Sequence, residues 1–101
     1  MRIFLVVKSF VPSHLKKDFD DWYEKEHLFE AKQTFYAISA FRGWEIENED
    51  IHYAYYEFDN LKKAYEILKS EALNKMVNIY NKKWSNQIDR TRNIISITQE
   101  I

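Results

Sequence analysis

The first third of the chain consists of a short apolar run followed by a longer amphipathic segment. Residues 3–10 include five consecutive apolar side chains, a pattern typical of a strand that is buried on both faces. Pro12 and Ser13 interrupt this run, and Ser13 is a suitable N-cap for a helix. We expect that helix over about 14–33, where apolar residues return every three or four positions.

Two further strands are expected close together in the sequence. They cover about 40–48 and 51–58, where aromatic and β-branched residues are frequent. A short polar turn, Asn-Glu-Asp, separates them, so the pair should form an antiparallel hairpin. The segment 34–39 before the hairpin favours extended structure, which leaves the end of the first helix open.

The second half of the chain returns to helix and then strand. Asp59 or Asn60 is suited to cap one helical stretch, and Ser70 begins another with the same 3.6-residue period. The last strand is expected over about 92–100. The β-α-β-β-α-β order predicts a single α+β domain over residues 1–101, with a ferredoxin-like fold and a four-stranded antiparallel sheet that carries its helices on one face.

The face of the sheet without helices is also expected to be apolar. Strand 51–58 places Tyr53 and Tyr55 on one face, and its other face carries Ala54, Tyr56 and Phe58. Helices on one side cannot cover both faces, so we expect a second copy of the chain to cover the open one. The predicted partner of the protein is therefore itself, as a homodimer.

The first helix contains two polar residues close to its apolar face. On a helical wheel of about 100° per residue, Glu26 falls within the apolar stripe and His27 at its edge. The stripe consists of Leu15, Phe19, Trp22, Tyr23 and Phe29. A carboxylate in such a place must be paired, hydrogen-bonded, protonated or in contact with water. Glu26 could therefore meet Arg2, Arg42 or a tyrosine hydroxyl for structural reasons, or it could border a cavity between helix and sheet.

His27 and the aromatic residues allow the same two interpretations. His27 could be a boundary residue bonded to a backbone carbonyl, or a general acid or base, since its unperturbed pKa of about 6.5 suits proton transfer. Aromatic residues make up 17% of the chain, so they could either fill the core or stack on a planar ligand. The residues with a polar tip that could do so are Trp22, Trp44, Tyr53, Tyr55, Tyr56 and Trp84.

Composition excludes several classes of protein. Fifteen basic and 16 acidic residues give a net charge of −1, which lacks the basic surface of a nucleic-acid-binding protein. The absence of cysteine excludes disulfides, thiol catalysis and Cys-based metal sites. The three histidines, His14, His27 and His52, are far apart in the sequence, so no metal site is predicted. No Gly-rich phosphate loop or nucleophile elbow is present, and no cofactor is expected.

No targeting or membrane segment is expected either. The N-terminal apolar run is too short for a signal peptide and has no small-residue cleavage site. No stretch approaches the roughly 20 apolar residues that span a bilayer. A cytoplasmic location and no membrane partner are therefore the expectations.

The pattern Phe19-x-x-Trp22-Tyr23-x-x-Glu26-His27 resembles the EthD-like branch of the dimeric α+β barrel superfamily. The end of the third strand, Tyr56-Glu57-Phe58, and Trp84 before the last strand also match features of that branch. The Pro-Gly turn that often precedes the second strand of these proteins is absent here, since the chain has FYAISAF.

The resemblance implies a ferredoxin-like subunit whose sheet pairs face to face with that of a partner, and a mostly apolar cavity in each subunit. Members of the superfamily include cofactor-independent monooxygenases, isomerases and cyclases. The resemblance also implies His27 as the pocket histidine, surrounded by Trp22, Tyr23 and Glu26.

Two hypotheses for the function follow. The chain could be a cofactor-independent oxygenase, isomerase or cyclase that acts on a planar small molecule, with His27 moving a proton and Glu26 or a tyrosine orienting it. Alternatively it could be a non-catalytic ligand-binding or structural homodimer, in which the aromatic residues are simply core. Whether the protein is an enzyme, and on which substrate, is left open by the sequence.

Overall fold

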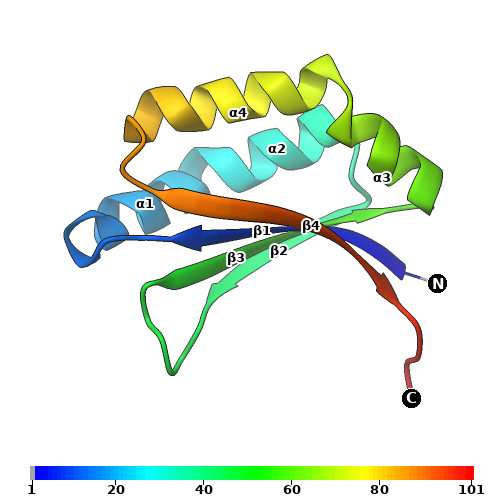
Figure 1. Ribbon diagram of the computed structural model, residues 1–101, viewed down its shortest axis with the longest axis horizontal. Coiled ribbons are helices and arrows are strands. Elements are labelled where there is room, and N and C mark those ends of the chain that lie inside the picture. The colour runs from blue at the N-terminus through cyan, green and yellow to red at the C-terminus, as the bar shows by residue number, and fades with distance from the viewer. Residues whose placement is uncertain (1) are drawn as a thin grey trace.

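The computed structural model describes residues 2–101 as one antiparallel sheet with all its helices on one face (Figure 1). The elements are β1 (Arg2–Phe10), a 3-10 turn η1 (Ser13–Leu15), α1 (Lys16–Trp22), a π-helical turn η2 (Tyr23–His27), α2 (Leu28–Phe35), β2 (Ser39–Trp44), β3 (Ile51–Phe58), α3 (Leu61–Leu68), α4 (Glu71–Trp84) and β4 (Asp89–Ile97). This order confirms the predicted ferredoxin-like βαββαβ fold, with the second helix divided in two.

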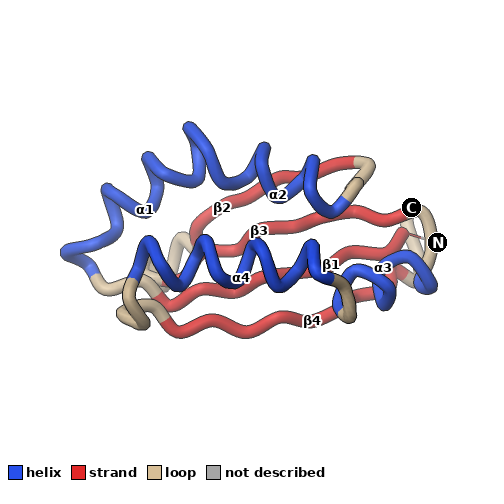
Figure 2. The backbone as a smooth tube through the Cα atoms, turned by 90° about the horizontal axis from the view of Figure 1, so that it is seen from above, coloured by secondary structure: helices blue, strands red, loops and turns tan. Residues whose placement is uncertain are grey.

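The four strands lie in the order β2-β3-β1-β4, so the first and third strands form the centre of the sheet. Leu5 of β1 lies opposite Tyr56 of β3 on one side and Ile94 of β4 on the other. Seen from above, α1 and α2 run over the β2 side and α4 runs beside them, while β4 lies at the opposite edge (Figure 2).

Two strand boundaries differ from the sequence-based expectation. β4 covers Asp89–Ile97 rather than 92–100, because it pairs with the whole of β1, from Phe10↔Asp89 to Arg2↔Ile97. β2 ends at Trp44 rather than at 48, where the chain turns into β3. The predicted caps of the later helices are confirmed, since the side chain of Asn60 accepts from the backbone of Lys63 and Ser70 caps α4 in the same way.

The first helix is interrupted by one π-helical turn, and this turn changes which residues are buried. Phe19, Tyr23, His27, Ala31 and Phe35 are all buried and lie four residues apart. On a uniform α-helix such a row would drift by about 40° per step and leave the sheet. The π-turn absorbs one extra residue, about 100° of rotation, and so keeps the row facing the sheet.

The π-turn explains why the helical wheel was wrong beyond Trp22. Glu26, expected in the apolar stripe, is exposed, and so is Phe29, at 69%. His27, expected at the edge, is buried. The helix then ends at Tyr36, which adopts the left-handed conformation with φ 54°, in place of the glycine that such a position favours.

The sheet face opposite the helices, here called the open face, is apolar and aromatic. Phe41 stacks on Tyr55 with ring centres 4.9 Å apart, and Phe4 meets both rings edge to face. Phe41 remains 45% exposed and Ile95 42%. The expectation of an apolar surface on the open face is confirmed by these residues. Figure 1 shows that the helices all lie on the other side of the sheet.

Candidate functional site

A small cavity lies between the helix layer and the centre of the sheet. Its volume is about 30 Å³, and most of its walls are apolar. Its polar lining residues come from η2, β3, α4 and β4, and they are Tyr23, His27, Tyr56, Tyr80, Arg90 and Arg92. Three phenol rings, one imidazole and two guanidinium groups thus surround one apolar space.

His27 is held rigidly at the wall of this cavity. Its ring stacks on Trp22 with centroids 4.1 Å apart and meets Tyr23 at 4.9 Å, edge to face. Nδ1 is buried and has no hydrogen-bond partner among residues 2–101, so the interpretation in which it donates to a backbone carbonyl is not observed. Burial, and then the positive charge of Arg90, lower the pKa of His27 to about 4. The imidazole is therefore neutral at pH 7.

The tyrosine hydroxyls of the cavity are kept in the protonated form. Burial raises the pKa of Tyr23 and of Tyr56 well above the ordinary value. Burial also raises the pKa of Tyr80, whose hydroxyl lies 3.0 Å from Oγ of Ser9 on β1. The site therefore offers hydrogen-bond donors and acceptors with little charge of their own.

The positive charge in the site comes from β4. The guanidinium carbon of Arg90 lies 3.7 Å from the centre of the Tyr80 ring, which fixes it against α4. Burial lowers the pKa of Arg90, and the neighbouring charge of Arg92 does so too. Both side chains line the cavity, and neither forms a salt bridge within the described part of the chain.

A second polar group lies next to this cavity, on the β2 side. Asp20 accepts from Nη1 of Arg42 at 2.7 Å and from Nε1 of Trp44 at 2.8 Å, and these contacts, Trp44 first, lower its pKa. Arg42 also donates to Nε2 of His52 at 3.3 Å, so the His52 proton resides on Nδ1. Burial, followed by the charge of Arg42, lowers the pKa of His52 to about 3.

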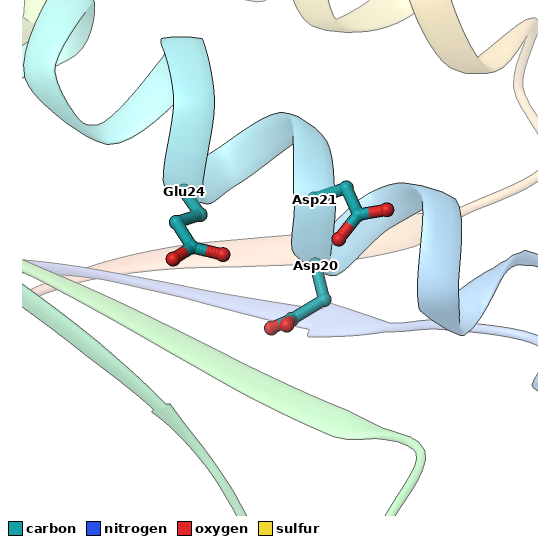
Figure 3. A group of neighbouring side chains, drawn as sticks. All are labelled: Asp20, Asp21 and Glu24. Atoms are coloured by element: carbon teal, nitrogen blue, oxygen red, sulfur yellow. The ribbon is translucent and has the colours of Figure 1, made fainter.

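Asp20, Asp21 and Glu24 bring three carboxylates together on the surface of the first helix (Figure 3). One oxygen from each lies within 4.8 Å of the others, so the group has the spacing of metal ligands. Asp20 is already neutralised by Arg42, and Glu24 is exposed, so the arrangement has the character of a solvated acidic surface.

The tryptophans named from the sequence gather around one central ring. Phe19 contacts Trp22, Trp44 and Trp84 with centroid distances of 5.5–6.2 Å. Trp84 is buried, and its Nε1 has no partner among residues 2–101. None of the three tryptophans lines the cavity; they form its outer support, with Trp22 stacked on the back of His27.

The remaining residues named from the sequence lie elsewhere. Glu26 borders shallow hollows on the outer surface of the helix, beside Trp22 and Lys25, and does not share the His27 cavity. Its proposed pairing with Arg2 or Arg42 is not observed, since those arginines bond Glu57 and Asp20 instead. Tyr53 and Tyr55 belong to the open face, because alternate residues of β3 point to opposite sides.

Sequence reasoning missed three polar residues of the cavity, Tyr80, Arg90 and Arg92. Tyr80 falls within the 3.6-residue apolar repeat that follows Ser70, a pattern typical of core positions. Arg90 lay outside the expected strand, which began three residues too late. No alternation of apolar and polar residues marks this start, and Arg90, Arg92 and Ile94 share one face only once pairing with β1 extends β4 back to Asp89.

The sheet order, the βαββαβ connections and the single helix layer define a ferredoxin-like fold. An EthD family protein from Bacillus halodurans has this fold with a TM-score of 0.74 and 13% identity, over 97% of this chain and 100% of that one. A mutant of the cofactor-independent oxygenase SnoaB from Streptomyces nogalater matches with a TM-score of 0.68 and 10% identity, over 99% of this chain and 96% of that one.

A Deinococcus radiodurans protein that is a candidate antibiotic biosynthesis monooxygenase matches with a TM-score of 0.69 and 11% identity, over 100% of this chain and 96% of that one. These likenesses confirm, at the level of the fold, the resemblance found in the sequence. No protein-family model and no curated protein sequence matches the chain. Among the described residues, every helix is too short or too polar to cross a membrane.

Proposed function

We propose that the protein binds a planar small molecule in the His27 cavity and acts on it without a cofactor, as an oxygenase, isomerase or cyclase. The observation that carries this proposal is the buried, neutral imidazole of His27, which borders a cavity and whose Nδ1 has no partner among residues 2–101. Unpaired buried polar groups are uncommon and cost about 1–3 kcal/mol each. His52 Nδ1 and Trp84 Nε1 are also buried without a partner among residues 2–101, but of these three residues only His27 lines the cavity, where a ligand could supply the missing partner.

The chemistry available to such a site is proton transfer and stabilisation of a developing anion. Neutral His27 can accept a proton from an acidic C–H or O–H group, and the hydroxyls of Tyr23 and Tyr80 can donate to the resulting oxyanion. With a pKa of about 4, His27 is a weak base in the empty site. A negative charge bound beside it would raise that pKa and make the proton transfer more favourable.

A ring compound requires the cavity to enlarge. Ligand pockets measure roughly 300–1,000 Å³, whereas this cavity measures about 30 Å³. One wall is formed by α4, through Leu73, Met76 and Val77, and methionine adapts readily to a new shape. We therefore propose that α4 slides along the sheet when the ligand enters, as packed helices do in shear motions, and that Met76 repacks to make room.

The test uses anthrone, a planar ketone with an acidic CH₂ group. Removal of one proton gives a planar anion that reacts with O₂, and the balanced reaction is anthrone + O₂ → anthraquinone + H₂O. Oxygen uptake and anthraquinone absorbance are measured for the wild type, His27→Gln and His14→Gln. His14 is exposed and remote, so it provides the matched control.

We expect His27→Gln to lower kcat by roughly 10²- to 10⁴-fold, and His14→Gln to leave it unchanged. Turnover by His27→Gln at the wild-type rate would exclude His27 from the reaction. A wild-type protein that neither turns over nor binds planar compounds would favour the alternative, a non-catalytic structural homodimer in which the aromatic residues are only core.

We propose further that the open face is covered by a second copy of the chain, in face-to-face packing of the two sheets. A hollow of about 300 Å³ on this face is lined mainly by apolar side chains, including Phe4, Phe41 and Tyr55. Sedimentation equilibrium should show a dimer for the wild type and a monomer for Phe41→Lys. Tyr36→Lys, on an exposed aromatic outside this face, is the control and should remain dimeric. A wild-type monomer at all concentrations would refute the proposal. A cytoplasmic location stays a prediction.

A further inference from the structure

Two arginines occupy positions of β4 that face the helix layer. Arg90 pairs with Ser9 and Arg92 with Val7 across the β1–β4 ladder. Ser9 reaches Tyr80 on α4, so this face of the sheet is the one covered by helices. Side chains of directly paired residues point to the same side of a sheet. Both arginines therefore belong to the inner face, where apolar residues would be the ordinary choice.

The positive charge of this pair has no carboxylate to balance it among residues 2–101. Each of the four salt bridges in that range involves another cation, namely Arg2, Arg42 or Lys63. The side-chain acceptors of Arg90 within that range are neutral, namely the amide oxygen of Asn81 at 3.5 Å and the hydroxyl of Tyr80. The other polar groups that line the cavity are neutral, since His27 and the tyrosines carry no charge at pH 7. Two guanidinium groups without a carboxylate partner in that range thus border one apolar space, Arg90 half-buried and Arg92 exposed to solvent.

We propose that the ligand of this site is an anion, a planar compound that carries a carboxylate or an ionised phenol held by Arg90 and Arg92. This inference rests on the proposed function and specifies its substrate class. Guanidinium groups bind planar carboxylates through paired, charge-assisted hydrogen bonds. Such a ligand would place its anionic group at the β4 edge, on one side of the cavity, and its ring toward His27 and Tyr23, on η2.

A purely structural explanation leads to a different expectation. β4 is an edge strand, and charged side chains on edge strands prevent pairing with other chains. If protection were the only role of the arginines, the site would not distinguish an anion from a neutral compound of the same shape. Discrimination between two such compounds therefore separates the two explanations.

The experiment compares 2-naphthoate with 2-naphthamide, a neutral compound of nearly the same shape. Binding of each to the whole chain is measured by isothermal titration calorimetry at pH 7. The variants are Arg92→Gln, Arg92→Lys and Arg90→Gln, and Lys62→Gln removes an exposed charge elsewhere as the control. Because Arg90 packs on Tyr80, its removal could loosen the whole site, so the quantity compared is the ratio of the two dissociation constants.

We expect the wild type and Lys62→Gln to bind 2-naphthoate at least about 10-fold more tightly than the amide, since hydrogen bonds to charged groups are among the strong ones. Arg92→Gln and Arg90→Gln should each bring the ratio toward one, and Arg92→Lys should keep part of it. Equal binding of both compounds by the wild type would overturn the anion inference while the proposed site stands. If both glutamine variants kept the wild-type ratio of the two dissociation constants, Arg90 and Arg92 would not be the residues that bind the anion. Binding of neither compound would count against both proposals.

Discussion

Acid should destabilise this protein well above the pH at which its carboxylates are protonated, because two histidines are buried in the neutral form. The pKa of His27 is lowered to about 4 and that of His52 to about 3. Below a pH of about 6.5 the unfolded chain therefore binds protons that the folded chain does not. Folding stability must then fall as the pH falls, and the loss continues until the folded pKa values are reached.

The size of the effect follows from the two pKa values. Between pH 7 and pH 5, a histidine with a pKa of about 6.5 unfolded and about 4 folded loses about 1.9 kcal/mol of folding free energy. His52 loses nearly the same amount over this interval, about 1.9 kcal/mol, because both folded pKa values lie at or below about 4. Together the two histidines would remove a large share of the roughly 5–15 kcal/mol that stabilises a typical domain.

Urea unfolding at half-unit steps from pH 7 to pH 5, at one fixed protein concentration, measures this loss directly. His27→Gln should be less stable at pH 7 but should show about half the wild-type pH dependence, because one of the two buried titrations is gone. His14→Gln, on the exposed η1 turn, should keep the full dependence. If both variants kept the wild-type slope, or if the His27 ring protons titrated near the unperturbed pKa of about 6.5 by NMR, the assignment of a buried neutral imidazole would be refuted.

Three further changes test local features of the fold by urea unfolding. Tyr36→Gly should stabilise the protein by about 0.5–1 kcal/mol, because residue 36 is exposed and its φ of 54° strains most residues other than glycine. A loss of stability would show that the tyrosine side chain contributes more than this strain costs. Asp20→Asn should destabilise the protein by about 1–3 kcal/mol, because it leaves Arg42 without its charged partner. The same substitution should cost less in a protein that already carries Arg42→Met, and an equal cost in both backgrounds would contradict the coupling of the two residues. Deletion of the exposed Lys25 should convert the π-turn to regular α-helix and change the free energy of unfolding by less than about 1 kcal/mol. Insertion of an alanine after Glu30 should instead unfold the end of α2. Equal losses of stability in the two variants would argue against the π-turn.

The order of elements could be predicted from the sequence because each element carries its own periodicity. Strand β1 is a continuous apolar run, and α4 repeats apolar residues at helical spacing behind the Ser70 cap. The start of β4 could not be found this way. Its inner face carries Arg90 and Arg92, so no alternation of apolar and polar residues marks it, and only pairing with β1 fixes its extent.

The candidate site was only partly predictable, for a reason that lies in the π-turn. A helical wheel assumes a constant rotation of about 100° per residue. The extra residue in the π-turn at Tyr23–His27 breaks this assumption, so that Glu26 is exposed and His27 is buried. The strict four-residue spacing from Phe19 to Phe35 was present in the sequence and is the signal that reveals the turn.

The two features that the sequence pattern did not predict, the π-turn and the early start of β4, both place polar residues at the cavity. The π-turn turns His27 inward, and the extended β4 brings Arg90 and Arg92 to the same space. Sequences tend to break a local rule where function requires it and to follow such rules elsewhere. The buried imidazole of His27, whose Nδ1 has no partner among residues 2–101, and the half-buried guanidinium group of Arg90 each destabilise the empty site. A bound anion would relieve both, because it would pair with the arginines and favour protonation of His27. The two anomalies therefore have one common explanation, and the naphthoate and naphthamide comparison tests it.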